Sequence, residues 1–531
     1  MSNHRVSFSH PEEHIYKSNS SSGMAISMDF LSNPFSIPII TTTYLLLLLC
    51  LYVYTQQRKG KLTKKYHPIA GTMLNQLFNF HRFHDYMVDL ASKHGTYRLI
   101  TPFRYEVYTS DPVNVEYILT TNPENYIKGT YNHTILKDLL GNGIFTVDGD
   151  KWREQRKVKS HNFSTKALRE VNTLIFRENA VELAHTLSEA ASNDQILDMS
   201  VIFMRASLDA VFKVAFGMDP ESMFGSSEES VRFNDFFDDA SAMTLKRYVD
   251  VTWKIKKFFN IGTEAKLKEN VKVVDEFVYK LIKIKTEQID KNEDSRYKGD
   301  VLTRFLQFKD MSPQYLRDII LNFIIAGKDT TSSGMTWFIY LLCKHPEIQD
   351  KVAKEIKEVI KFKDVTDFTG FVNAMTEDVL EKMHYLHATL TETLRLYPAV
   401  PLGVKICAED DVLPDGCHVN KGDMMTYQPY AMGRMKLLWG DDANEFKPER
   451  WIDENGCFRS ESPFKFTAFQ AGQRICLGKE FAYREMKIFA SMILGCFVFK
   501  LDDENKQAKF KKTLNLHING GLHVRVFNRP Q

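Results

Sequence analysis

The sequence lacks several features that mark whole classes of protein. Its seven cysteines form no C-x-x-C pair, which argues against a secreted disulfide scaffold and a zinc module. Basic and acidic residues nearly balance, 69 against 67, so a protein dedicated to binding nucleic acid is not expected. No G-x-G-x-x-G unit, internal repeat or low-complexity linker occurs after residue 60. The remaining composition, 44% hydrophobic and 26% charged, excludes wholesale disorder.

One uncharged apolar run lies near the start of the chain, from Phe35 to Tyr54. Roughly 20 such residues in a helix rise about 30 Å, the thickness of a hydrocarbon core. Basic residues come directly after the run, whereas before the run acidic residues outnumber basic ones. The positive-inside rule therefore leaves the rest of the chain in the cytosol. A cleaved signal peptide is the alternative interpretation. We expect a polar extension over 1–34, a transmembrane anchor over 35–55 and a basic linker over 56–70.

The chain after the linker alternates between helical and strand patterns. Ser312-Pro313 is a favourable helix start, and that helix is expected to run to His345, before Pro346 begins the next one. Period-two alternation and apolar runs predict strands at 96–100, 104–108, 400–406, 423–428 and 514–526, the last interrupted by a turn at Gly520-Gly521. The fold class expected for 71–531 is therefore α+β, a single mainly α-helical domain with small β-sheets.

The most specific motif is a cysteine loop near the C-terminus. Residues 469–478 read Phe-Gln-Ala-Gly-Gln-Arg-Ile-Cys-Leu-Gly, the pattern F-x-x-G-x-R-x-C-x-G. The segment resembles the haem-binding motif of the cytochrome P-450 superfamily of haem-thiolate monooxygenases. The resemblance implies the cytochrome P-450 fold, haem b as cofactor and Cys476 as the axial ligand of the iron, where a thiolate favours O–O cleavage. It also implies that Phe469, Gly472 and Gly478 are haem-binding residues, the two glycines by letting the backbone turn and approach the porphyrin.

Residues expected to meet the haem propionates lie in three separate segments. Trp152 and Arg156 stand at i and i+4 on one helix face, and resemble the family's W-x-x-x-R helix. By the same resemblance, Arg474 in the cysteine loop pairs with a propionate, and Lys405 stands where the family often has a further basic partner.

Two charged motifs precede the loop. Glu392-Thr-Leu-Arg395 places opposite charges on one helix face, which alone would be a solvated surface pair. Arg395 lies 81 residues before the loop cysteine, and Pro448-Glu-Arg450-Trp451 falls between them. This order is similar to the family's E-x-x-R and P-E-R-F motifs, with Trp451 in place of Phe. The resemblance assigns Glu392, Arg395 and Arg450 to structure, holding the haem loop.

The long helix contains Ala326-Gly-Lys-Asp-Thr-Thr331, which is similar to the family's oxygen-activation motif A/G-G-x-D/E-T. Without the family, the same residues are a weak spot in a helix, because Gly and Thr lower helix propensity. The resemblance implies that Ala326 and Gly327 leave room for dioxygen and that Asp329 and Thr330 deliver protons to it. Lys328 is expected to point outward.

Several segments resemble the plant branch of the family that oxidises long-chain fatty acids at the methyl end. They are Tyr66–Gly71, Leu140–Lys157, Ser160-His161, Phe163-Ser164 and Val412–Gly416. The function this implies is terminal (omega) hydroxylation of a long-chain fatty acid, with a narrow apolar channel presenting the chain end. The residues expected to line that channel, each of them equally acceptable as plain core, are Phe323, Ala326, Val400 and Leu402.

The sequence also predicts the partners of the protein. No residues remain to build a flavin domain, so electrons from NADPH must arrive through a separate NADPH–cytochrome reductase, with O₂ as co-substrate. We expect a monomer, held in the endoplasmic reticulum membrane by its one anchor. Five basic residues are expected to form one face, which is either simply solvated or docks the reductase. They are Arg153, Lys157, Lys465, Lys479 and Lys487.

Other functions remain open on the sequence. The substrate is alternatively a sterol or terpenoid, or the protein is an oxygen-independent haem-thiolate isomerase or lyase. Members of that last kind tend to lose the acid–threonine pair, and Asp329-Thr330 is intact. A haem-binding sensor or carrier without turnover is a further alternative. Met28, just ahead of the apolar run, competes with Met1 as the natural start.

Overall fold

The computed structural model describes Tyr44 and residues 72–530, apart from 102–104, 165, 220–226, 292–299, 307–310, 363, 365 and 512. The expected polar extension, membrane anchor and basic linker, residues 1–34, 35–55 and 56–70, lie outside the described residues, Tyr44 excepted. Across the part that is described, no helix has the length and apolar character that crossing a bilayer requires. Residues from Thr72 onward cluster into one unit.

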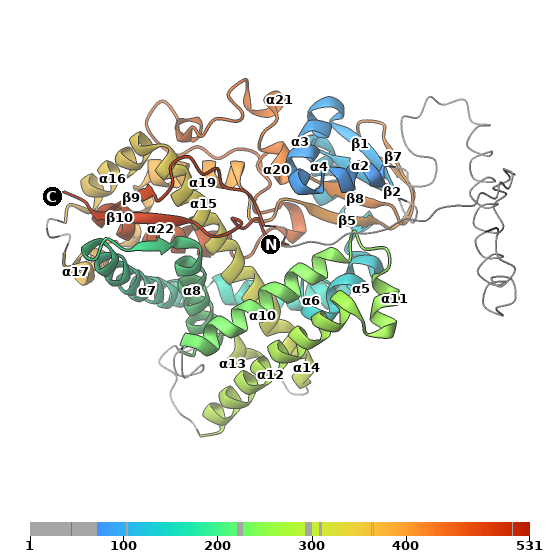
Figure 1. Ribbon diagram of the computed structural model, residues 1–531, viewed down its shortest axis with the longest axis horizontal. Helices are drawn as coiled ribbons and strands as arrows, with labels where there is room; N and C mark the ends of the chain where they lie inside the picture. The colour runs from blue at the N-terminus through green and yellow to red at the C-terminus, as the bar shows by residue number, and fades with distance from the viewer. Residues whose placement is uncertain are drawn as a thin grey trace, which may run out of the picture. The chain divides into compact units, whose positions relative to one another are not determined.

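Helices make up most of this unit (Figure 1). The α-helices are α2 (Met73–Phe78), α3 (Phe83–His94), α4 (Pro112–Glu116), α5 (Gly129–Leu140), α6 (Gly149–Ser164), α7 (Lys166–Ser192), α8 (Met199–Val211), α10 (Ser227–Lys246), α11 (Trp253–Phe259), α12 (Gly262–Asp290), α13 (Val301–Leu306), α14 (Pro313–Ile324), α15 (Thr330–Lys344), α16 (Pro346–Ile360), α17 (Phe368–Asn373), α18 (Glu377–Glu381), α19 (His384–Leu396), α20 (Pro429–Met432), α21 (Lys436–Trp439) and α22 (Lys479–Cys496). Short 3-10 helices are η2 (Phe80–Arg82), η4 (Pro123–Asn125), η7 (Pro448–Trp451) and η8 (Gly472–Arg474), and π-helical turns are η3 (Tyr117–Thr121), η5 (Phe212–Phe216) and η6 (Ile325–Asp329).

The described strands form three small sheets. They are β1 (Thr96–Ile100), β2 (Tyr105–Thr109), β3 (Tyr126–Ile127), β4 (Ile196–Asp198), β5 (Gly403–Cys407), β6 (Asp411–Val412), β7 (His418–Val419), β8 (Met424–Tyr427), β9 (Phe497–Leu501) and β10 (His523–Asn528). The largest sheet has the order β1-β2-β8-β5-β3, and its parallel β2–β8 pair joins the N-terminal and C-terminal parts of the unit. The second has the order β4-β10-β9, and β6 pairs with β7.

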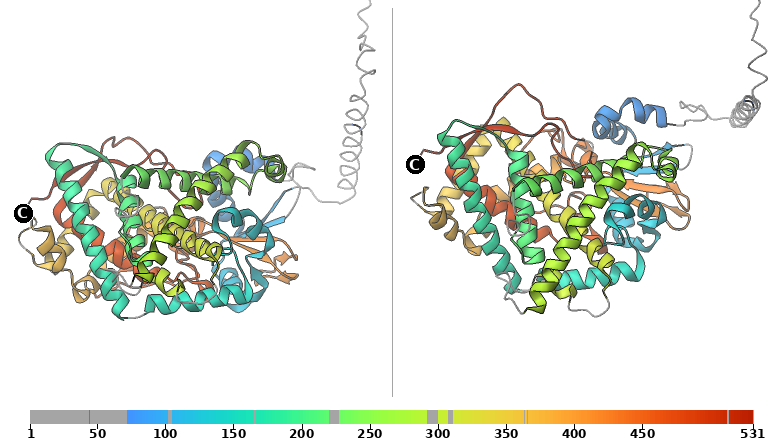
Figure 2. Two further views of the ribbon diagram at one scale, coloured as in Figure 1. Left: turned by 90° about the horizontal axis from the view of Figure 1, so that it is seen from below. Right: turned by 60° about the horizontal axis from the view of Figure 1, so that its bottom comes forward.

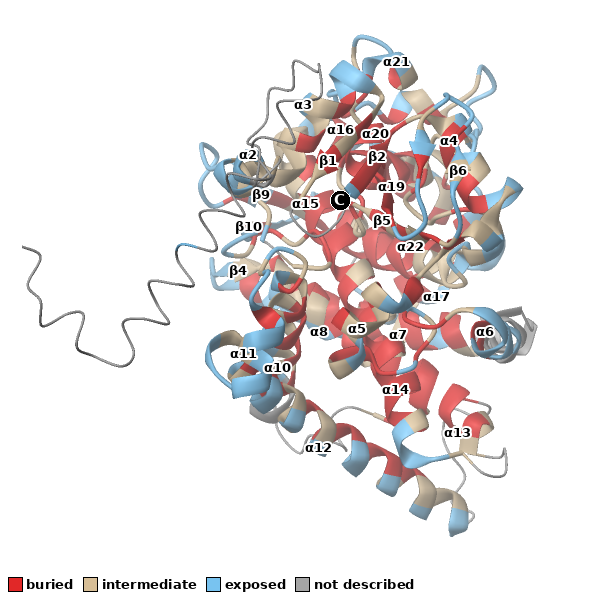
Figure 3. Cartoon of the chain, turned by 90° about the vertical axis from the view of Figure 1, so that its right-hand side faces the viewer, coloured by how far each residue is buried: buried red, intermediate tan, exposed pale blue. Residues whose placement is uncertain are grey.

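Most of the core lies in two clusters of buried side chains between helices. Met335, Leu390 and Met486 represent α15, α19 and α22 in one buried cluster, to which α7 and α8 also contribute. A second cluster lies among α10, α12, α13 and α14. Figure 2 shows α10 and α12 running side by side, and Figure 3 shows buried central helices beneath the exposed outer faces of α11 and α12.

Local sequence explains individual helices. In α16, Ile348, Val352, Ile356 and Ile360 are spaced four residues apart, and all are buried on the face that packs against α19 and α22. Pro346 occupies its first turn, where the missing N–H is not needed.

The predicted mainly α-helical class with small sheets is confirmed. Ser312 caps α14, since its side chain accepts a hydrogen bond from the Tyr315 N–H at 3.2 Å. The predicted strand at 96–100 is β1, and that at 104–108 is shifted by one residue to β2. In the segment 514–526, the predicted turn at Gly520-Gly521 is confirmed, since both glycines adopt positive φ, and the strand after it is β10. The part before the turn was wrong, because it forms no strand.

Candidate functional site

The cysteine loop, residues 469–478, contains η8 and ends where α22 begins. The Cys476 N–H donates to the Phe469 carbonyl oxygen at 2.9 Å and closes the loop. Gly472 has a φ of 65°, and a Cβ there would lie 2.0 Å from the Leu119 carbonyl oxygen, so a residue with a side chain does not fit. Gly478 donates its backbone N–H to the Cys476 thiol. The Cys476 side chain is accessible, so its sulfur is available to a ligand.

Two opposing influences act on that thiol. Desolvation by the surrounding protein raises the pKa of Cys476, whereas the Gly478 N–H and the charges of Arg156 and Lys479 lower it. The thiolate is the form that binds metal ions, and these three groups are the ones that stabilise it.

Three cationic residues lie close together beside the loop, and two of them, Lys405 and Arg474, line a pocket there. Lys405 is buried, and Lys128 and Arg474 are half-buried. Arg474 donates to a carboxylate oxygen of Asp148 at 2.7 Å, and the backbone N–H of Lys128 donates to the same carboxylate at 2.9 Å. Burial lowers the pKa of Lys128 to about 8, helped by Arg474, and burial together with Lys128 and Arg474 lowers the pKa of Lys405 far below its usual range.

When all three groups are protonated, the cluster has more positive charge than its own carboxylate can balance, and burial together with this surplus lowers the pKa values of Lys128 and Lys405. Asp148 offsets one of the three cations, and the nearby Glu124 is exposed and ion-paired with Arg153 at 3.3 Å. Because uncompensated charge away from water is costly, the surplus of about two charges suits a ligand with two anionic groups.

Trp152 and Arg156, the two residues of the W-x-x-x-R motif, both face the cysteine loop. Trp152 is buried, and the Arg474 guanidinium lies 4.5 Å from the centre of its indole ring. Arg156 donates to the Ile475 carbonyl oxygen at 2.7 Å. The structure thus brings Trp152, Lys405 and Arg474 together around one pocket. Arg156 contacts the adjoining cysteine loop, and Lys128 lies next to Arg474 and Asp148.

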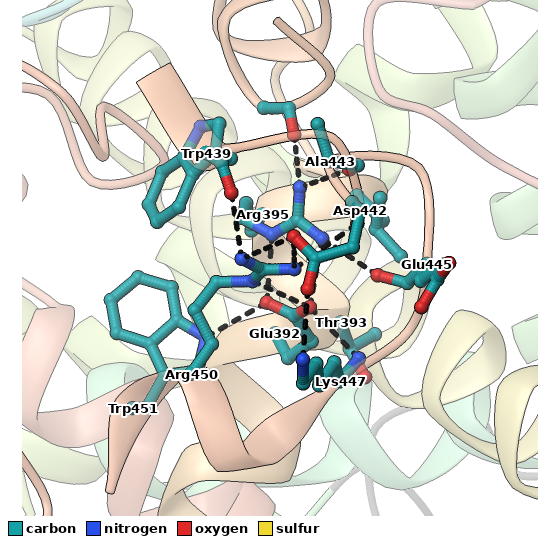
Figure 4. A network of polar contacts seen from close by, with 12 residues as sticks. Glu392, Thr393, Arg395, Trp439, Asp442, Ala443, Glu445, Lys447, Arg450 and Trp451 are labelled. Atoms are coloured by element: carbon teal, nitrogen blue, oxygen red, sulfur yellow. Dashed lines mark hydrogen bonds and ion pairs between the residues drawn. The ribbon is translucent and has the colours of Figure 1, made fainter. Parts of the chain in front are cut away.

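The E-x-x-R pair is fully buried (Figure 4). Two nitrogens of Arg395 each donate to a carboxylate oxygen of Glu392 at 2.7 Å. Arg395 also donates to the carbonyl oxygens of Gly433, Ala443 and Glu445, the last two at 2.6 and 2.9 Å. A surface ion pair would make none of these backbone contacts, so the solvated alternative is wrong for this pair.

Arg450 and Trp451 extend this network from η7. Arg450 lies 3.4 Å from Glu392 and donates to the Trp439 carbonyl oxygen at 2.9 Å and to Asp442 at 3.1 Å. The indole N–H of Trp451 donates to Glu392 at 2.8 Å (Figure 4). Phe at this position would have no N–H, so Trp451 gives Glu392 a donor that the motif's usual residue lacks.

The oxygen-activation motif falls on a π-helical turn between α14 and α15. The Thr330 hydroxyl donates to the Ala326 carbonyl oxygen at 2.5 Å within this turn. That Ala326 and Gly327 leave room for dioxygen stays a prediction, and Gly327 also allows the turn to pack closely against α8. A Cβ on Gly327 would lie 2.3 Å from Val211 on α8, so the space is filled by the neighbouring helix.

The expectation that Lys328 points outward is wrong. Its side chain has no exposed surface, and its ammonium nitrogen lies 2.6 Å from Asp329 and 3.2 Å from Asp238 on α10. Ile324 and Ser332, four residues before and after Lys328, are buried as well, so Lys328 lies on an inner face of the helix. Two carboxylates make its burial tolerable there.

The remaining candidates have mixed outcomes. The four expected channel residues are all half-buried, namely Phe323, Ala326, Val400 and Leu402. Lys487 leaves the expected basic face, because it is buried and donates to the Leu380 carbonyl oxygen at 2.8 Å. Arg153 and Lys157 are exposed on α6, and Arg153 is ion-paired with Asp150 at 2.9 Å.

A mainly helical unit that presents an accessible cysteine beside a surplus of cations has the construction of a haem-thiolate protein. Comparison with known proteins agrees. The family model described as Cytochrome P450 matches residues 63–523. The chain belongs to the cytochrome P450 family.

Relatives from plants align along most of the chain. Cytochrome P450 704C1 of Pinus taeda is 46% identical over 507 residues, which cover 92% of this chain and 98% of that protein. Cytochrome P450 704B1 of Arabidopsis thaliana is 40% identical over 512 residues, 90% and 97% of the two chains. Cytochrome P450 94A1 of Vicia sativa is 38% identical over 480 residues, 88% and 90% of the two chains.

Membership makes the protein a haem-thiolate monooxygenase. Its cofactor is haem b, its co-substrate is O₂, and its electrons come from NADPH through a separate reductase. The residues fit that cofactor, because haem b has two propionates and the cluster of Lys128, Lys405 and Arg474 has a surplus of about two positive charges over Asp148.

Sequence reasoning missed four residues around the site. Lys128 and Asp238 lie in no motif, Asp148 lies in the family-like segment 140–157 without an assigned role, and Lys328 occupies the variable position of a motif. Their partners include residues that only the fold brings close, across separations such as the 326 residues between Asp148 and Arg474. The Trp-for-Phe difference at Trp451 was visible in the sequence, but its hydrogen bond was not.

Proposed function

We propose that this monooxygenase hydroxylates the terminal methyl group of long-chain fatty acids, with Cys476 as the axial ligand of the haem iron. The observation that carries the proposal is the accessible cysteine beside the surplus of cations. The bound haem activates dioxygen, and the protein's own residues hold the haem, place the substrate and move protons.

Different residues take different roles in this proposal. Lys128, Trp152, Arg156, Lys405 and Arg474 hold the propionates. Phe469, Gly472 and Gly478 shape the loop, and the Gly478 N–H stabilises the thiolate. Glu392, Arg395 and Arg450 fix the segment that supports the loop. Asp329 and Thr330 deliver protons, and the intact pair disfavours an isomerase or lyase.

The substrate class is supported by the sequence segments that resemble fatty-acid hydroxylases and by the partial exposure of four apolar candidates. A channel lined by Phe323, Ala326, Val400 and Leu402 would admit an extended chain and leave its end nearest the haem. Terminal methyl C–H bonds are strong, so position rather than bond strength must decide which carbon reacts.

The proposed arrangement in the cell places an anchor over 35–55 in the endoplasmic reticulum membrane and the catalytic domain, 71–531, in the cytosol. Two facts support the domain start: the compact unit begins at Thr72, and the family match begins at residue 63. The exposed Arg153 and Lys157 on α6 would contribute to docking the reductase by charge.

Product analysis tests the substrate. Membranes that contain the full chain, the reductase and NADPH are incubated with a panel of fatty acids, a sterol and a terpenoid, and the products are identified by mass spectrometry. We expect omega-hydroxylated fatty acids. Hydroxylation of the sterol or terpenoid alone, or hydroxylation at mid-chain, would contradict the proposal.

A further inference from the structure

A buried ionic cluster adjoins the π turn, and no motif accounts for it. Lys328 lies between Asp329 on its own turn and Asp238 on α10, with nitrogen–oxygen distances of 2.6 and 3.2 Å. The ring of Phe237 lies 5.3 Å from the ammonium nitrogen, and the Met204 sulfur lies 3.2 Å from it. The cation therefore has two carboxylates and two soft, polarisable neighbours around it.

The C-terminal segment adds the remaining titratable groups that face the cluster, His517 and Lys511. Burial lowers the pKa of His517, so that it stays neutral near pH 7. The two carboxylates raise the pKa of Lys328, although burial alone would lower it. The Lys328 side chain therefore stays protonated, and its ammonium group is shared by the two carboxylates.

The three charged groups differ in their access to solvent. The side chain of Asp238 is 28% exposed, whereas those of Asp329 and Lys328 are 5% and 0% exposed. Asp329 immediately precedes Thr330, whose hydroxyl is held by the Ala326 carbonyl oxygen. Lys328 therefore forms ion pairs with both the Asp329 carboxylate, next to Thr330, and the Asp238 carboxylate on α10, which reaches the surface.

We propose that Lys328 is a positioning residue, which holds the carboxylate of Asp329 at the π turn for proton delivery and is itself held there by Asp238. An Asp329 carboxylate without this cation would be free to change rotamer or to lose its charge. Lys328 keeps its own protons throughout. The two protons that turnover consumes, in R–H + O₂ + 2e⁻ + 2H⁺ giving R–OH + H₂O, pass by way of Asp329 and are replaced from water.

The first measurement compares Lys328→Met with wild type in the full chain with haem and reductase. We expect product formed per NADPH to fall by roughly tenfold and hydrogen peroxide release to rise, with substrate affinity little changed, because misplacement of a proton donor affects the chemical step. Lys328→Arg, which retains the charge, should restore most of the coupling.

A matched control separates positioning from folding. Lys285 and Asp300 form another buried pair, 2.8 Å apart with both side chains 2% exposed, on α12 and before α13. Lys285→Met should lower the unfolding temperature and leave peroxide release at the wild-type level. Equal uncoupling in both Met variants, or normal coupling in Lys328→Met, would overturn the proposal.

A second measurement does not depend on turnover. Without Lys328, the buried carboxylates bind protons more tightly when folded than when unfolded, so stability should fall as pH rises from about 5 to about 8. The unfolding temperature of Lys328→Met should therefore drop more steeply over this range than that of wild type, and Lys328→Met/Asp238→Asn should recover part of the loss. An unchanged pH profile would exclude the ion pair.

The inference rests on the proposed proton delivery by Asp329 and not on the substrate. Failure of every fatty acid to react would contradict the proposed substrate and leave the pH profiles as an independent test of Lys328.

Discussion

Glu485 illustrates how its surroundings set the chemistry of a single residue. It is buried on α22, and desolvation raises its pKa to about 8 against the opposing effect of the nearby Thr331 and Ser207 hydroxyls. Between its ordinary pKa and this value, the folded chain binds a proton that the unfolded chain releases. The free energy of unfolding therefore decreases as pH rises through this range.

Glu485→Gln should remove that dependence, because the amide has a similar shape and no proton to lose. The unfolding temperature of the variant relative to wild type should rise steadily from about pH 5 to about pH 8 and stay level above it. Thermal unfolding followed by circular dichroism across this range checks the prediction. A constant difference at all pH values would mean that Glu485 is ionised in the folded protein.

Residues also differ in how far their roles could be predicted from the sequence. Cys476, Glu392 and Arg395 were found because their motifs fix spacing and order along the chain. Lys128 was missed, since its partner Asp148 is 20 residues away and the cation Arg474 is far beyond that. No local pattern encodes contacts of that kind.

At the scale of elements, the helix from α14 to α15 departs most from expectation. A continuous α-helix was expected, but the π turn η6 interrupts it. Lys328 lies in line with the buried Ile324 and Ser332, four residues before and after it, and so is not on an outer face. The start of α14 at Pro313 and the end of α15 before Pro346 were predicted, because capping and proline rules act locally. The π turn packs against α8, and helix propensity, which is a local property, does not predict such a tertiary contact.

Gly327→Ala tests that packing. The added Cβ would lie 2.3 Å from the branched side chain of Val211, so one helix must shift. We expect the free energy of unfolding to fall by about 1–3 kcal/mol. The double variant Gly327→Ala/Val211→Ala should show a favourable coupling between the two sites in urea unfolding. Additive losses would mean that the helices do not meet at this glycine.

At the scale of the whole molecule, segments far apart in the sequence assemble one site. The cations come from the residue before α5, from β5 and from η8, and the cysteine precedes α22. Fold class and family were predictable because several motifs occur in a fixed order. The charge balance of the site could not be predicted, because the near-zero net charge of the whole chain conceals a local surplus of positive charge.

The central claim is that Cys476 ligates the iron of a haem whose propionates this surplus binds. The absorption spectrum of the reduced, CO-bound full-length protein tests it most directly, with Cys476→His as the variant and Cys457→Ser, the other exposed described cysteine, as the control. We predict the red-shifted Soret band of thiolate ligation in wild type and in Cys457→Ser, and its loss in Cys476→His. An imidazole-type spectrum in wild type would contradict the account.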